Sequence, residues 1–186
     1  MKSLITFTIF FSFFTVMGQK FHTEFKYDDS INKVITIQNS YPKGGQKYTA
    51  QNGKEYVFAI FWTCITNETD TNLEIKIKLS SDSFIIPSSP NVNFNLYFPI
   101  EKMTLEKEPL PNYGLDLKLF LDKNIDKPTE FTTSISQNDS HLFYIVAISN
   151  QGINGVVRAG FELQKEKLIY KINNHEISCG QIITIE

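Results

Sequence analysis

Two cysteines and three histidines carry the widest range of chemistry in this 186-residue chain. Cys64 lies in an apolar run two positions after Trp62, and Cys179 lies near the end of the sequence. A single pair of cysteines in an exported chain predicts one disulfide, which would close a long loop and contribute on the order of 4 kcal/mol. Two isolated buried thiols are the alternative. A catalytic or metal-binding thiol is disfavoured, because exported thiols seldom stay reduced.

The histidines form no recognisable catalytic or metal-binding motif. His175 and Cys179 are four residues apart, which on a strand is roughly 13 Å and too far for one metal ion. Ser140 and His141 are chain neighbours, and neighbours on a strand point to opposite faces, so they cannot act directly as nucleophile and base. The sequence therefore predicts no catalytic residue, no metal site and no cofactor.

Acidic residues leave one enzymatic possibility open. The clusters at 28–29 and 68–70 lack the regular spacing of a calcium loop and are interpreted as solvated loop charges. Carboxylates from separate loops, Asp82 and Glu108 for example, could still meet in a cleft. A secreted hydrolase is therefore the alternative function, and two carboxyl groups facing each other within about 5 to 10 Å would favour it.

Several tyrosines lie near turns and strand ends. We expect Tyr97 and Tyr113 to be candidates for binding, because an exposed aromatic ring can stack on a sugar or fill a pocket in a partner protein. Tyr41 and Tyr48 have similar positions. The competing interpretation is that each ring covers a strand edge, since single exposed aromatics are common.

The charge of the chain excludes one class of partner. The formal net charge is −2, and Arg158 is the only arginine. A nucleic-acid-binding protein needs a basic stripe, which this sequence lacks, so no nucleic acid is expected. Recognition of a carboxylate or phosphate by a guanidinium fork is limited to one site at most.

The N-terminal segment has the pattern of a secretory signal peptide. Lys2 precedes an apolar stretch over residues 4–17, and Val16 and Gly18 are small enough for a cleavage site. The stretch is short for a membrane anchor. We expect residues 1–18 to be cleaved, residues 19–186 to form a single domain, and the mature protein to be secreted or periplasmic with no membrane span.

The remaining sequence reads as short strands separated by turns. Residues 55–65 and 142–148 are apolar on both faces and predict two central strands, whereas residues 73–79 alternate between apolar and charged. Asn52-Gly53 predicts a hairpin with a type I′ turn. The predicted core contains Phe58, Ile60, Trp62, Leu73, Ile75, Ile77, Leu79, Ile145 and Ile177.

The fold class follows from the number and spacing of these strands. About nine short strands predict an all-β fold, an antiparallel β-sandwich of immunoglobulin-like character, with a closed β-barrel as the alternative. Residues 115–125 alternate as a strand would, but also place their leucines on one helical face, and we favour a short helix that crosses between the sheets. Residues 103–113 are expected to be an excursion at one end, where binding surfaces often lie.

The chain also resembles uncharacterised small secreted proteins of Bacteroidetes-type bacteria. The resemblance spans most of the mature chain and rests on short stretches at residues 35–40, 42–45, 61–62, 66–69, 108–110, 112–114 and 179–180. It implies an exported single domain and carries no function. The likeness to immunoglobulin-type domains is looser, because Trp62 and Cys64 share one strand and Cys179 follows at a long interval.

The sequence does not identify an activity. Because it contains no convergent set of nucleophile, base and orienting acid, we predict a non-enzymatic exported protein that binds a partner protein, a glycan or a small ligand at the cell surface or in the periplasm.

Overall fold

The structure is a computed structural model that describes residues 21–28 and 34–185. The predicted signal peptide, residues 1–18, lies outside the described residues. The described part is mostly β-structure with one α-helix. Its strands are β1 (Phe21–Asp28), β2 (Val34–Ser40), β3 (Lys43–Thr49), β4 (Glu55–Asn67), β5 (Asn72–Leu79), β6 (Phe84–Ile86), β7 (Ser89–Tyr97), β8 (Thr129–Ile135), β9 (Asp139–Ser149), β10 (Ala159–Gln164), β11 (Lys167–Ile172) and β12 (His175–Ile185).

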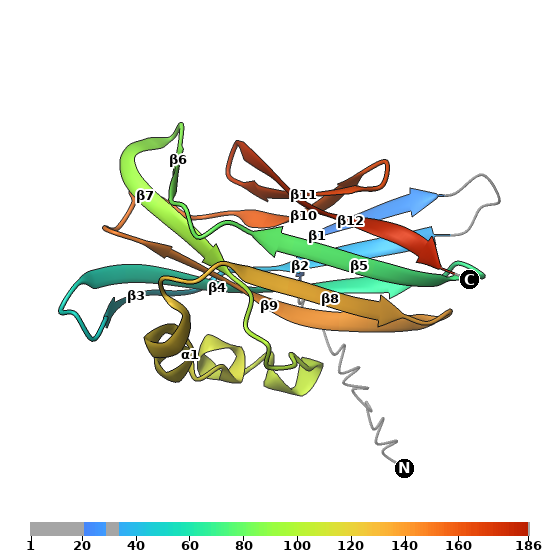
Figure 1. Ribbon diagram of the computed structural model, residues 1–186, viewed down its shortest axis with the longest axis horizontal. Coiled ribbons are helices and arrows are strands. Elements are labelled where there is room, and N and C mark those ends of the chain that lie inside the picture. Colours follow the sequence, from blue (N-terminus) through green and yellow to red (C-terminus); the bar gives the residue numbers. More distant parts are fainter. Residues whose placement is uncertain (1–20, 29–33, 186) are drawn as a thin grey trace, which may run out of the picture.

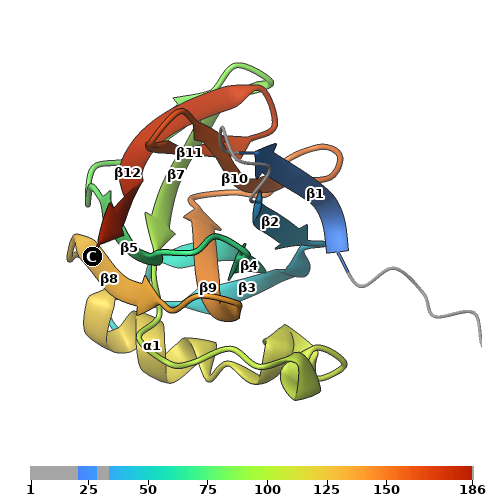
Figure 2. The same ribbon diagram turned by 90° about the vertical axis from the view of Figure 1, so that its right-hand side faces the viewer.

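The strands form two antiparallel sheets. The seven-stranded sheet has the order β1-β2-β4-β9-β7-β6, and β3 also pairs with β4. The five-stranded sheet has the order β10-β11-β12-β5-β8. Figures 1 and 2 show the two sheets curving around a shared interior. The all-β antiparallel prediction is confirmed, although the described residues contain twelve strands rather than about nine.

Two strands were hard to see in the sequence. Residues 41–45 contain a proline and two glycines, which is typical of a break between strands, but β3 begins at Lys43 and continues across an irregularity in its pairing with β4. β6 is only three residues long and lies in a stretch rich in serine and proline, which reads as a loop. The predicted β3–β4 hairpin is present, but its turn is not type I′, since Gly53 has a φ of +80° and Asn52 does not adopt a positive φ.

A helical segment connects β7 to β8. It contains two 3₁₀ turns, η1 (Leu105–Lys107) and η2 (Pro111–Gly114), followed by α1 (Leu117–Asn124). Asp116 caps α1 by accepting a hydrogen bond from the backbone N–H of Leu119. The predicted short helix near residues 115–125 is therefore present. Figure 2 shows the segment lying against the outer side of the seven-stranded sheet.

The seven-stranded sheet is consequently buried on both faces near its centre. The inter-sheet core lies between the sheets and includes Phe61, Ile65, Phe143 and Ile145 from β4 and β9. The outer core lies between the same strands and the helical segment. It contains Tyr48, Ala50, Phe58, Ile60, Trp62, Cys64, Tyr97, Met103, Tyr113, Leu115, Leu117, Leu121, Tyr144, Val146 and Ile148.

The residues that we predicted to be buried divide between the two cores. Phe58, Ile60 and Trp62 lie in the outer core. The inter-sheet core takes most of the others, namely Leu73, Ile75, Ile77, Leu79 and Ile145. Ile177 packs against the inter-sheet core but is only partly buried. A shift in the pairing of β11 with β12 next to Cys179 makes Ile182, rather than Ile183, the buried residue further along β12.

A buried asparagine joins the two sheets. Asn39 on β2 is 1% exposed, and its side chain donates to the carbonyl of Phe161 on β10 (3.0 Å) and accepts from the N–H of the same residue (2.8 Å). It also accepts from the hydroxyl of Thr63 (2.9 Å). Gly160 is needed at this point, since a Cβ there would lie 2.5 Å from Cγ of Asn39. These polar atoms are satisfied inside the protein and fix the position of β10.

Candidate functional site

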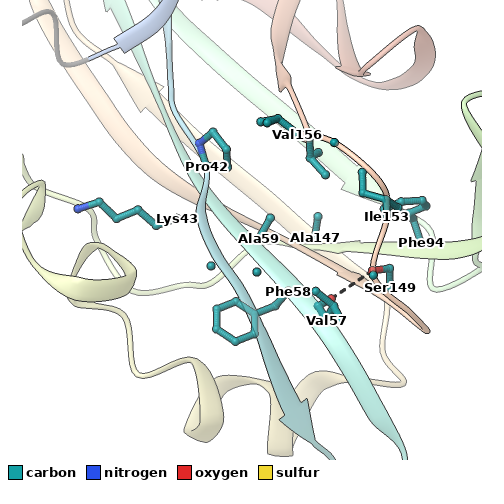
Figure 3. Close-up of a pocket in the computed structure, with 15 residues that line it drawn as sticks. Pro42, Lys43, Val57, Phe58, Ala59, Phe94, Ala147, Ser149, Ile153 and Val156 are labelled. Carbon is teal, nitrogen blue, oxygen red and sulfur yellow. Dashed lines mark hydrogen bonds between the residues drawn. The ribbon is translucent and has the colours of Figure 1, made fainter.

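A pocket lies on the inner face of the seven-stranded sheet, between that sheet and residues 150–158 (Figure 3). Its volume is about 310 Å³, at the lower end of the range for small-molecule sites. Most of its lining is apolar or small. The lining residues are Pro42, Lys43, Gly44, Gly45, Val57, Phe58, Ala59, Phe94, Ala147, Ser149, Gly152, Ile153, Gly155, Val156 and Val157.

The floor of the pocket is a row of small residues across three strands. Ala59 on β4 pairs with Ala147 on β9, and Gly44 on β3 pairs with Ala59 from the other side. Directly paired residues on one face of a sheet are cross-strand neighbours, so the row leaves a hollow on the inner face. Gly44 cannot be replaced without strain, because its φ is +135° and a Cβ would lie 2.5 Å from the carbonyl oxygen of Phe58.

Residues 150–158 cover the pocket. At the start of this segment, the N–H of Asn150 donates to the carbonyl of Asn93 on β7 (3.2 Å). At its end, the N–H of Arg158 donates to the side chain of Asn173 (2.9 Å), and the N–H of Asn173 donates to the carbonyl of Arg158 (2.7 Å). The segment is thus held at both ends, while Ile153 and Val157 pack against the inter-sheet core.

The polar groups that line the pocket are engaged elsewhere. Lys43 points away from the cavity in Figure 3, and its ammonium donates to the carbonyls of Glu108 and Leu110 and lies 4.2 Å from the ring centroid of Tyr113. The hydroxyl of Ser149 lies 2.9 Å from the carbonyl of Gln151 and 3.3 Å from that of Val57. The pocket therefore offers apolar surface without a charged group directed into it.

The disulfide that we predicted between Cys64 and Cys179 is absent, and both thiols are free and buried. The prediction was wrong because the cysteines belong to different cores. Cys64 faces the helical segment in the outer core, whereas Cys179 faces the space between the sheets. Burial raises the pKa of the Cys64 thiol and raises that of Cys179 to about 12, so both remain protonated at neutral pH.

The prediction that Tyr97 and Tyr113 present exposed rings was also wrong. They are 1% and 2% exposed, and their burial raises the pKa of both hydroxyls. The hydroxyl of Tyr97 donates to the carbonyl of Ile125, and that of Tyr113 to the carbonyl of Tyr41. Tyr97 and Tyr113 thus tie the helical segment to the rest of the protein. Tyr48 is buried as well, so Tyr41 is the exposed member of the four tyrosines named in the sequence analysis.

Two of the histidines considered for catalysis or metal binding, His141 and His175, pack against aromatic rings. His141 packs against Phe131 with ring centroids 5.5 Å apart, and burial lowers its pKa. His175 stacks on Phe84 at 5.4 Å. Over residues 21–28 and 34–185, no three side chains of histidine, cysteine, aspartate or glutamate are grouped so that they could hold a metal ion.

The carboxylates suggested for a hydrolase do not line the main pocket. Asp82 lies in the turn after β5, where it accepts from the hydroxyl of Ser80, and Glu108 follows η1. A second hollow, beside α1, does contain carboxylates. There Asp116 caps the helix, while Glu101 and Glu130 pair with lysines.

Comparison of the chain with family models, with curated proteins and with solved structures found no match. The resemblance to secreted bacterial proteins therefore stays a prediction. In the part of the chain that the structure describes, no helix has the length and hydrophobicity needed to cross a membrane.

Little in the sequence indicates the pocket. Ala59 and Ala147 belong to apolar runs that correctly predict central strands, but alanine and phenylalanine count alike in such a pattern. A weaker signal lies in the covering segment, because residues 150–155 are rich in glycine and asparagine, a composition that by itself predicts only a turn.

Proposed function

We propose that the protein is an exported, non-enzymatic binding protein, secreted or periplasmic, that holds a small apolar ligand or ligand group in the pocket floored by Ala59 and Ala147. The observation that carries the proposal is the paired alanines beneath an anchored covering segment. The signal-peptide pattern of residues 1–18 supports export.

The size of the pocket limits the affinity that it can provide. Each buried methylene contributes roughly 0.8 kcal/mol, so a six-carbon chain gains about 5 kcal/mol before the cost of immobilising it. A Kd in the millimolar range, no tighter than about 0.2 mM, is therefore expected for a simple aliphatic probe.

Calorimetric titration with 1-hexanol tests the proposal. The wild-type protein should bind about one molecule per chain, and Ala147→Leu should weaken binding by at least about tenfold, because the added side chain fills the hollow. Ser134→Leu makes a comparable addition at an exposed position of β8 and serves as the matched control. Equal binding by wild type and Ala147→Leu, or none by wild type, would contradict the proposal.

We also infer that the two sheets form a β-sandwich of immunoglobulin-like character rather than a closed barrel. The order of strands supports this, since the described pairings join strands within each sheet and none joins the sheets to each other. Asn39 and the inter-sheet core provide the contact between the layers instead.

A protein partner is the second candidate, favoured by exposed apolar residues on the helical side. Ile100 is 96% exposed, and Leu105, Leu110 and Leu119 are about half exposed. Because single exposed apolar residues are common, the grouping on one segment is the relevant feature. Replacing Ile100 and Leu119 with serine should abolish capture of a partner while leaving 1-hexanol binding unchanged.

A further inference from the structure

Arg158, the only arginine in the sequence, lies beside the exposed ring of Tyr41. The guanidinium carbon of Arg158 is 5.4 Å from the ring centroid of Tyr41, and His22 meets the same ring edge-on, with centroids 5.4 Å apart. A small hollow of about 130 Å³ adjoins them, lined in part by His22, Arg158 and Asn173. Three segments distant in sequence thus meet at one surface point.

Hydrogen bonds fix the backbone at this point. The hydroxyl of Tyr113 donates to the carbonyl of Tyr41 (2.6 Å), and the backbone of Arg158 exchanges two hydrogen bonds with Asn173. The arginine and the tyrosine therefore project from anchored positions. A guanidinium stacked on an aromatic ring keeps its N–H edge available for a planar acceptor.

Among the described residues around the hollow, one cation has no ion-pair partner. Lys171 pairs with Glu162 (2.8 Å) and with Glu176 (3.1 Å). By contrast, no carboxylate of the described residues forms an ion pair with Arg158. Burial and the neighbouring guanidinium lower the pKa of His22, so its imidazole is neutral at neutral pH. The guanidinium is thus a positive charge that no described carboxylate neutralises, beside a lysine whose charge is balanced by two carboxylates, and one such charge suits a monoanion.

We propose that Arg158, with Tyr41 and His22, binds the carboxylate of a small ligand. A carboxylate is planar and singly charged, and it matches the two parallel N–H donors of a guanidinium. A neutral imidazole and a tyrosine hydroxyl supply further donors at the same place. The site is distinct from the apolar pocket, because none of these three residues lines that pocket.

The carboxylate has two possible sources. Pro42 and Val157 line the apolar pocket, and their chain neighbours are Tyr41 and Arg158, so the two sites adjoin along both segments. One source is an acid whose hydrocarbon part occupies the pocket, and this version rests on the proposed function. The other is a sugar acid that binds at Arg158 alone, independently of the pocket.

Binding of four probes tests the proposal and separates the two sources. Hexanoate is compared with 1-hexanol, and glucuronate with glucose, by calorimetry on the mature chain. We expect at least one acid to bind about tenfold more tightly than its neutral counterpart, and Arg158→Gln to remove that difference. Arg158→Lys, which keeps the charge but loses the fork, should retain part of it. A preference for hexanoate identifies the first source, and a preference for glucuronate the second.

Two outcomes would overturn the proposal. Either each acid binds no more tightly than its neutral counterpart, or Arg158→Gln leaves the preference unchanged. Because Arg158 is exposed, the variant should fold, and its thermal unfolding provides the control. Binding of 1-hexanol reports on the pocket separately, so a failure of the proposed function is distinguishable from a failure at Arg158.

Discussion

The inner face of β4 and β9 is filled at one end and hollow at the other. At the filled end, Phe61 pairs with Ile145 and Thr63 with Phe143. Aromatic rings from both sheets pack there, and the ring centroids of Phe143 and Phe161 are 5.7 Å apart. At the hollow end, the next pair on this face is formed by Ala59 and Ala147.

The difference shows how one pair of strands can serve stability and binding in separate places. Buried aromatic side chains contribute through the area that they remove from water, so the filled end supplies much of the stability. Alanines contribute little burial, and their small size leaves a cavity whose apolar walls suit a ligand. Changes at the filled end should therefore affect folding, and changes at the hollow end should affect binding.

Thiol labelling should give the largest contrast between filled and hollow regions. Cys64 and Cys179 are packed in the cores and protonated, so native alkylation with iodoacetamide should be on the order of 10⁴-fold slower than in the unfolded chain. An introduced thiol at the mouth of the pocket, Val156→Cys, should react readily in the native state, because Val156 lines the pocket and is 59% exposed. Mass spectrometry measures both.

The same experiment checks the absence of the disulfide. After denaturation without reductant, both native cysteines should become alkylated. Failure to label them under those conditions would show that they are bonded to each other.

Removal of a large ring from the filled end should have the next largest effect. Phe143→Ala should reduce the free energy of unfolding by about 3–5 kcal/mol, because it leaves a cavity among rings that cannot collapse to fill it. Urea unfolding provides the measurement. A loss below about 1 kcal/mol would contradict the description of this end as filled.

Loss of the polar link between the sheets should cost somewhat less. Asn39→Leu leaves the N–H and carbonyl of Phe161 without their partner, and we expect a loss of about 2–3 kcal/mol in urea unfolding. Gln38→Leu is the matched control. Gln38 is the chain neighbour of Asn39, but its side chain forms only an exposed hydrogen bond to Glu24, so the substitution should change the free energy of unfolding by less than about 0.5 kcal/mol. Equal effects of the two substitutions would contradict the role given to Asn39.

Added bulk should have the smallest effect on stability where there is room for it. Ala147→Leu should change the free energy of unfolding by less than about 1 kcal/mol, because the hollow accommodates the side chain. Ala159→Leu makes the same change at a position of the inter-sheet core that does not line the pocket, and it should reduce the free energy of unfolding by about 1–3 kcal/mol through overpacking. The reverse order of the two effects would mean that the hollow is not open to a side chain.

Patterns in the sequence predicted elements better than they predicted the site. Two-sided apolar runs marked β4 and β9 as central, and leucine spacing marked α1, because periodicity reports on which faces are buried. Periodicity does not report what lies opposite a face. The cysteines were therefore paired although they face different cores, and Tyr97 and Tyr113 were expected at the surface although the helical segment covers them.

The pocket itself depends on a relation between distant residues. Gly44, Ala59 and Ala147 are adjacent only once the register of three strands is set, and Arg158 meets Tyr41 only through the pairing of sheets and the covering segment. One sequence contains no information on register beyond its hydrophobic pattern and turns. The hollow and the arginine site consequently became visible only in three dimensions.

Nuclear magnetic resonance of the alanine methyl groups gives the most direct test of the apolar pocket. With alanine methyls labelled, 1-hexanol should produce saturable shifts at Ala59 and Ala147, with a Kd in the millimolar range and no tighter than about 0.2 mM. The methyl of Ala50, which lies in the outer core, should not move. Shifts at Ala50 alone, or an absence of saturable shifts at Ala59 and Ala147, would contradict a ligand site in this pocket.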